Sequence, residues 1–192
     1  MTRSPEASID EQFLSRWSPR AFKSDPISED QVASLFEAAR WSPSCFNEQP
    51  WLFVYATNTN KTEHERIASL LVDGNRVWAE KAPLLGIVFA RRSFAGNDKP
   101  NRWAAFDSGA ASMCMTLQAN KMGLVTHFMG GIHEDQCYGA LGVSKDDYEA
   151  MAGFAVGQQG NAADLPESLR EREAPSDRKP LAEVAYEGGV AE

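Results

Sequence analysis

Residues 41–51 read Trp-Ser-Pro-Ser-Cys-Phe-Asn-Glu-Gln-Pro-Trp, and they join a segment of helical pattern to the apolar run 52–55. Pro43 and Pro50 each fix φ and lack an N–H donor, so this loop is expected to be stiff and to display its remaining polar groups. Amides and hydroxyls between large aromatic residues suit a flat heterocycle with polar edges. An ordinary helix-to-strand connection could have the same composition, so the residues alone leave both interpretations open.

Composition excludes several classes of protein. A chain of 192 residues, 43% hydrophobic and 24% charged, predicts a single domain over residues 1–192. The net charge of −8 argues against a nucleic-acid partner. No apolar run is long enough to span a membrane, and the polar first ten residues show no secretory signal. Three cysteines without CxxC spacing fit a cytoplasmic protein that has neither a disulfide framework nor a metal site.

Hydrophobic periodicity predicts helices over residues 10–17, 28–39, 62–72, 103–122 and 134–141, and strands over 50–56, 84–90, 124–128 and 151–156. The segment 103–122 is small and apolar on most sides, which fits either a homodimer core or the central helix of a monomer. Residues 161–180 form a polar segment, and an edge strand is expected over 181–186, either within the chain or across a dimer.

Two further clusters carry candidate binding groups. Arg16, Ser18 and Arg20 place two guanidinium groups and a hydroxyl around a predicted helix end, as phosphate recognition favours. Gly130 and Gly131 follow a predicted strand and would let a ligand approach the backbone closely. Solvated surface charges and a simple tight turn are the alternatives.

The stretch 42–51 resembles the Ser-Pro-Ser-x-x-Asn-x-Gln-Pro-Trp segment of the nitroreductase family of flavin enzymes, and the resemblance extends from about residue 13 to 187. The ending around Arg178, Arg-Lys-Pro-Leu-Ala-Glu-Val, is similar to the family's Arg-x-Pro-Leu-x-Glu-Val. The resemblance implies an α+β fold with a central, mainly antiparallel sheet flanked by helices. It also implies a homodimer that holds flavin mononucleotide (FMN) at its interface, with the 42–51 loop contributed by the partner subunit.

The resemblance also implies which residues bind FMN. The implied set is Arg16, Ser18, Arg20, Pro43, Ser44, Cys45, Asn47, Gln49, Asn75, Gly130, Gly131 and Arg178, with the Gly130 amide near flavin N5 and Arg178 at the phosphate. Arg16, Ser18 and Arg20 together would contact the pyrimidine side of the ring, the ribityl chain and the phosphate. Two positions depart from the family, because Trp78 and Ser176 stand where many members have Lys. From the residues alone, Asn75 is equally well explained as a helix cap.

The implied activity is transfer of hydride from NADPH or NADH through flavin N5 to an electron-poor acceptor, such as a nitroaromatic or a quinone, in a ping-pong reaction. Flavin carries this chemistry, so no catalytic side chain and no metal is expected. One alternative is an FMN-binding or flavin-handling protein of the same fold without NAD(P)H reductase activity. The other is a thiol-dependent enzyme built on Cys45.

Overall fold

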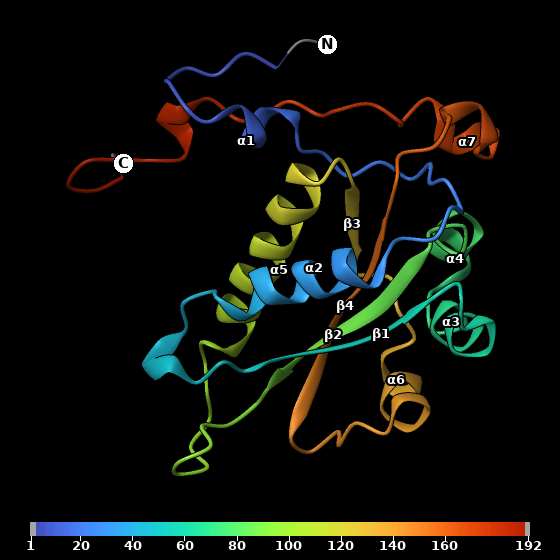
Figure 1. The fold of residues 1–192 in the computed structure, drawn as a ribbon. Coiled ribbons are helices and arrows are strands. Elements are labelled where there is room, and N and C mark those ends of the chain that lie inside the picture. Colours follow the sequence, from blue (N-terminus) through green and yellow to red (C-terminus); the bar gives the residue numbers. More distant parts are fainter. Residues whose placement is uncertain (1–2, 191–192) are drawn as a thin grey trace.

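The computed structural model describes residues 3–190, and its centre is a four-stranded sheet with the order β1-β2-β4-β3. The strands are β1 (Trp51–Thr57), β2 (Leu84–Arg91), β3 (Val125–Met129) and β4 (Tyr148–Gly157). Each neighbouring pair runs antiparallel. The predicted α+β class with a mainly antiparallel sheet is therefore confirmed (Figure 1).

Strand β2 is buried along nearly its whole length because it is apolar and lies between β1 and β4. Gly86 in this strand is required by packing. A Cβ there would lie 2.2 Å from the Phe154 ring and 2.7 Å from the carbonyl oxygen of Val54. The missing side chain lets the Phe154 ring lie across the strand.

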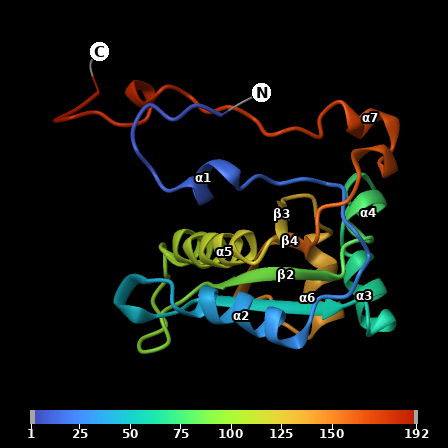
Figure 2. The same cartoon turned by 45° about the horizontal axis from the view of Figure 1, so that its top comes forward.

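Two long helices, α2 (Glu29–Arg40) and α5 (Ala104–Lys121), pack against each other and against the sheet. Leu35 of α2, Met115 of α5 and Phe154 of β4 are fully buried in the shared core. Helix α5 packs over one face of the sheet, where it contacts β1, β2 and β3 (Figure 2). Its small side chains leave room for a cavity between the helix and the strands.

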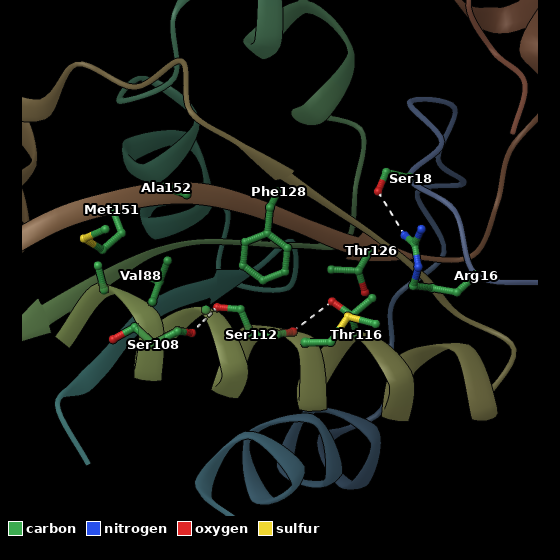
Figure 3. Close-up of a pocket in the computed structure, with 13 residues that line it drawn as sticks. Arg16, Ser18, Val88, Ser108, Ser112, Thr116, Thr126, Phe128, Met151 and Ala152 are labelled. Carbon is green, nitrogen blue, oxygen red and sulfur yellow. Dashed lines mark hydrogen bonds between the residues drawn. The ribbon is translucent and has the colours of Figure 1, made fainter. Parts of the chain in front are cut away.

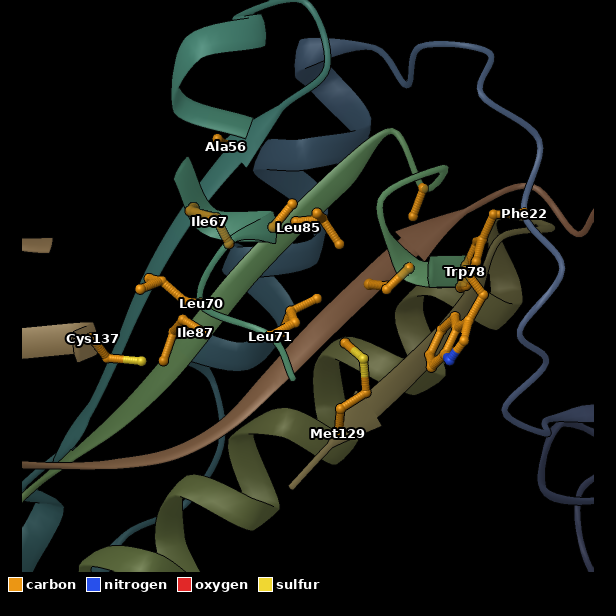
Figure 4. Close-up of a cluster of buried hydrophobic side chains, with 14 of the residues drawn as sticks. Phe22, Ala56, Ile67, Leu70, Leu71, Trp78, Leu85, Ile87, Met129 and Cys137 are labelled. Atoms are coloured by element: carbon orange, nitrogen blue, oxygen red, sulfur yellow. The ribbon is translucent and has the colours of Figure 1, made fainter. Parts of the chain in front are cut away.

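The second core cluster covers the other face of the sheet, beneath α3 (Lys61–Ala68), α4 (Asp73–Ala79) and α6 (Glu134–Leu141). Trp78 is 1% exposed and its ring stacks on Phe22 with centroids 6.3 Å apart (Figure 4). The helix predicted over 62–72 ends earlier, at Ala68, because the chain turns there to bury Leu70 and Leu71; α4 follows it as a separate helix.

The N-terminal residues 3–6 and the C-terminal residues 176–181 lie side by side above α5 (Figures 1 and 2). The backbone N–H of Leu181 donates to the Glu6 carboxylate at 3.2 Å. The short helices are α1 (Glu11–Ser15), η1 (Cys45–Asn47), η2 (Ala162–Asp164), α7 (Glu167–Arg170) and η3 (Leu181–Glu183).

The expected edge strand over residues 181–186 is wrong for the single chain, where a 3-10 turn follows Pro180. The N–H groups of Glu183 and Val184 donate to the carbonyls of Pro180 and Leu181 at 3.0 Å. The segment contacts the N-terminal residues and pairs with neither edge strand of the described sheet, β1 or β3.

Candidate functional site

A cavity of about 430 Å³ lies between α5 and the strands β2, β3 and β4 (Figure 3). Phe128 points from β3 toward the helix. Arg16 and Ser18 lie at one end of the cavity, where Arg16 Nη1 donates to the Ser18 hydroxyl at 3.4 Å. The lining is otherwise apolar or neutral: Val88, Ala105, Ser108, Gly109, Ser112, Met113, Thr116, Thr126, Phe128, Met151 and Ala152. Arg16 is the only ionisable side chain of the described residues that lines this cavity.

The hydroxyls of Ser108 and Thr126 are buried against this cavity and have no hydrogen-bond partner within residues 3–190. The neighbouring hydroxyls on α5 do have partners: Ser112 donates to the Ser108 carbonyl, and Thr116 donates to the Ser112 carbonyl, each at 2.8 Å. A buried hydroxyl without a partner costs about 1–3 kcal/mol. Two such groups around one cavity indicate that a ligand with polar groups completes their hydrogen bonding.

Beyond Arg16, a second cavity of about 570 Å³ brings together residues from both ends of the chain. Arg3, Arg16, Ser176 and Arg178 all line it. Burial, followed by the charges of Arg3 and Arg178, lowers the pKa of the Arg16 guanidinium below its ordinary value. Three guanidinium groups that repel one another favour a bound anion, and a phosphate fits their forked donors.

Arg20 is held differently, by the buried carboxylate of Glu173. One carboxylate oxygen accepts the backbone N–H groups of Arg20 and Ala21 at 2.7 and 2.8 Å. The other oxygen is 3.8 Å from Arg20 Nη1 and has no hydrogen-bond partner among the described residues. Arg20 therefore lies in an ion pair, whereas Arg16 and Arg178 have no carboxylate within ion-pair distance in residues 3–190.

Asn75 and the glycine pair form a second corner of the predicted site. The Asn75 amide donates to the carbonyl of Gly131 at 3.0 Å. A Cβ on Gly131 would lie 2.6 Å from Asn75 Nδ2 and 2.8 Å from Val72, whereas nothing described lies within 4 Å of a Cβ on Gly130. The turn is thus closed on the Gly131 side and open on the Gly130 side, where a ligand could approach the backbone.

The loop residues Pro43, Ser44, Cys45, Asn47 and Gln49 line neither cavity. Three non-glycine residues here have φ between 50° and 58°, namely Phe46, Asn47 and Gln49. Positive φ costs free energy at such residues and is frequent in ligand-binding loops. The Ser44 hydroxyl accepts the Gln49 N–H at 2.9 Å, which stabilises the strained turn.

Within one chain the loop and the arginines lie at opposite ends of α5. The Cys45 N–H donates to Asp107 in the first turn of the helix, at 3.0 Å. Asn120 in the last turn donates to the Gln12 carbonyl of α1 at 3.4 Å. Thirteen residues at 1.5 Å per residue separate these contacts by about 20 Å. One chain therefore does not bring the two parts of the predicted site together.

The two departures from the family pattern have different structural settings. Trp78 belongs to the core, where its indole N–H donates to the Gly74 carbonyl at 3.1 Å. It offers no hydrogen bond to a ligand. Ser176 does line the second cavity, and its hydroxyl accepts from Arg178 at 3.2 Å. Cys45 has an aspartate carboxylate beside its amide rather than a cation, which does not favour a reactive thiolate.

Three residues of the two cavities, Arg3, Ser108 and Thr126, were not predicted from the sequence, nor was Glu173, which pairs with Arg20. Arg3 and Ser176 are 173 positions apart, and no local motif connects them. Ser108 and Thr126 lie in stretches whose pattern indicates only a buried helix and strand. Within residues 3–190 no helix is both long and apolar enough to cross a bilayer, and no cluster of His, Cys, Asp or Glu could hold a metal.

The antiparallel sheet, the mostly apolar cavity and the adjoining arginines define a scaffold for a largely flat ligand with an anionic end. The Nitroreductase family model matches residues 14–86 and 71–158, so the chain belongs to the nitroreductase family. A solved structure described as an oxidoreductase containing FMN is 40% identical, with a TM-score of 0.93 over 98% of this chain and 96% of that one.

The chain is also similar to two curated proteins. An uncharacterised 15.4 kDa protein of Mycolicibacterium smegmatis is 34% identical over 64% of this chain and 80% of its own length. A Streptomyces griseus protein is 24% identical over 85% of this chain and 91% of its own length. The name of the latter describes a candidate NADH dehydrogenase/NAD(P)H nitroreductase.

Proposed function

We propose that this protein is an FMN-dependent oxidoreductase that accepts hydride from NADPH or NADH and reduces an electron-poor acceptor. The single observation that carries this proposal is the cavity beside α5, in which the hydroxyls of Ser108 and Thr126 have no hydrogen-bond partner in residues 3–190. The family assignment supports it, as does the 40% identical oxidoreductase that contains FMN.

FMN fits the donor set of the two cavities. Arg16 and Arg178 would hold the phosphate, the hydroxyls of Ser18 and Thr126 would serve the polyol chain, and apolar side chains such as Phe128 would cover the ring. In the cavity beside α5, Arg16 is the only ionisable side chain among the described lining residues, so this cavity offers no general base of its own. When bound, FMN supplies hydride and single-electron transfer through its ring.

The protein's own contribution would then be binding, orientation and electrostatics. The Arg16 guanidinium, which has no carboxylate within ion-pair distance in residues 3–190, places a positive charge at one end of the cavity. Such a charge favours negative charge that develops on a bound electron carrier. The open backbone at Gly130 would let its N–H face the cofactor, and the Asn75 amide holds this turn in place.

The proposal includes a homodimer, because one chain separates the strained loop from the arginines. Trp41, Phe46 and Phe106 are 73%, 89% and 75% exposed, and the first two belong to or adjoin that loop. Large exposed apolar residues of this kind indicate an interaction surface. A partner subunit that covered them would bring Asn47 and Gln49 of its own loop to the site. The free cysteines fit a cytoplasmic location.

A second candidate is an FMN-binding or flavin-handling protein that does not react with NAD(P)H. Trp78 favours it, because the side chain is buried where better-known members have a Lys that reaches toward the flavin. Ser176, in place of a second Lys, would leave the phosphate with one cation fewer than usual.

Initial-velocity kinetics test the proposal. The FMN-loaded protein is given NADPH or NADH at several concentrations, with a quinone or a nitroaromatic compound as acceptor. Parallel double-reciprocal lines would support the ping-pong reaction, because each substrate would then react with a different form of the enzyme. Absence of acceptor-dependent NAD(P)H oxidation would favour the flavin-handling alternative.

A further inference from the structure

We infer that Arg3, from the N-terminal segment, is a phosphate-binding residue that compensates for the Lys absent at position 176. The inference rests on the proposed function, since it concerns how this chain would hold FMN. The carbonyl of Ser176 accepts a hydrogen bond from Arg3 Nε at 3.1 Å. The guanidinium of Arg3 therefore lies beside the position where many members of the family carry the cation.

The contacts of Arg3 fix its guanidinium without neutralising it. Arg3 Nη1 donates to the carbonyls of Leu14 and Arg16, the first at 2.8 Å and the second at 2.5 Å. Together with Ser176 these acceptors are three neutral carbonyls on two distant segments. The Nη2 group has no acceptor in the described part of the chain and remains free to donate to a ligand.

The electrostatics around Arg3 point the same way. Arg3, Arg16 and Arg178 line one cavity. Burial and the charge of Arg178 lower the pKa of Arg3, and Asp177 opposes this effect. Two carboxylates face the region, but Asp177 accepts the Arg178 N–H and Glu6 accepts the Leu181 N–H. A phosphate dianion would supply the charge that the cluster lacks.

The contact with Arg3 also gives the N-terminal residues a role. Glu6 and Arg3 tie residues 3–6 to the C-terminal segment 176–181. Because the guanidinium is already held in one orientation, little side-chain entropy remains to be lost when an anion binds. A cation delivered by a preformed contact can thus replace one that a lysine at 176 would deliver from within the C-terminal segment.

The test compares the affinities of FMN and riboflavin, which share the ring and the polyol chain but differ in the phosphate. Fluorescence titration of the FMN-free full-length protein gives both dissociation constants. We expect Arg3→Ala to weaken FMN binding about tenfold, as loss of one charge-assisted hydrogen bond would, and to leave riboflavin binding unchanged. Arg3→Ala/Ser176→Lys should recover most of the lost FMN affinity, because it restores a cation at the same place.

Arg66→Ala is the matched control, because it also removes one guanidinium charge. Arg66 forms an exposed ion pair with Glu63 of the same helix. Equal weakening of FMN and riboflavin by Arg3→Ala would overturn the inference and leave Arg3 a packing role. Unchanged FMN binding by Arg3→Ala would overturn it too, while the proposed function would stand. If the wild-type protein binds no FMN, the proposed function fails first and the inference fails with it.

Discussion

Replacement of Arg20 by Ala should destabilise the protein even without a ligand, because it leaves Glu173 without its partner. The Glu173 side chain is 2% exposed and that of Arg20 is 20% exposed. One carboxylate oxygen keeps its two backbone N–H donors after the change, from residue 20 and Ala21. The other oxygen already has no hydrogen-bond partner among the described residues, and it would lose the nearby guanidinium as well.

The expected magnitude follows from this geometry. Removal of one partner from a buried ion pair costs about 3–5 kcal/mol. The two remaining N–H donors and the partial exposure of Arg20 reduce this cost, so we expect a loss of about 2 kcal/mol in the free energy of unfolding. For a chain of this length, that loss corresponds to a decrease in Tm of about 4–8 °C.

Thermal unfolding of the FMN-free protein, followed by circular dichroism, measures this effect. Arg16→Ala is the matched variant, because Arg16 lines the same region but has no carboxylate within ion-pair distance in the described residues. Its Tm should change by no more than about 2 °C. Arg20→Ala/Glu173→Gln should recover most of the Tm, since the double variant removes the unpaired charge. An Arg20→Ala protein with wild-type Tm, or a double variant as unstable as the single one, would refute this account of the pair.

The remaining predictions concern three other parts of the site. Thr126→Val should leave the FMN-free protein as stable as the wild type, or more stable by about 1 kcal/mol, because it removes a buried hydroxyl that has no hydrogen-bond partner among the described residues. The same change should weaken FMN binding severalfold. A lower melting temperature for this variant would contradict the prediction. Gly131→Ala should lower the stability by about 1–3 kcal/mol because its Cβ would displace Asn75, whereas Gly130→Ala should melt as the wild type does; equal melting temperatures for both variants would refute the packing analysis. Burial lowers the pKa of His127. Below about pH 6.5 the unfolded chain therefore binds a proton at this residue that the folded protein does not bind, and the free energy of unfolding should decrease as the pH falls through that value. An NMR titration that gave His127 an ordinary or raised pKa would contradict this.

Long segments with one strong pattern were predictable from the sequence. The helix α5, rich in small apolar residues, and the apolar strand β2 begin and end within two residues of the predicted bounds. Strand β4 begins three residues earlier than predicted, because Tyr148–Ala150 pair with the end of β2. Helix α4 was not predicted as a separate element, since its seven residues show little periodicity and its Trp78 is buried only by tertiary packing.

Other features depend on residues that are far apart in the chain, and local patterns do not show them. The strand predicted over 181–186 assumed an available sheet edge, but that segment lies on the N-terminal residues instead. The sequence motif around Arg16 correctly drew attention to the region of the two cavities. It could not show that Arg3 reaches Ser176 or that Glu173 pairs with Arg20, because these contacts span more than 150 residues.

The central claim is that the cavity beside α5 holds an FMN that NAD(P)H reduces. The measurement that tests it most directly is the absorption spectrum of the FMN-loaded protein without oxygen, recorded before and after addition of NADPH and, separately, NADH. The account predicts a flavin band at about 450 nm that bleaches with at least one of the two donors. A flavin band that neither donor bleaches would contradict the reductase and favour flavin handling. A protein that stays colourless after incubation with FMN would contradict both.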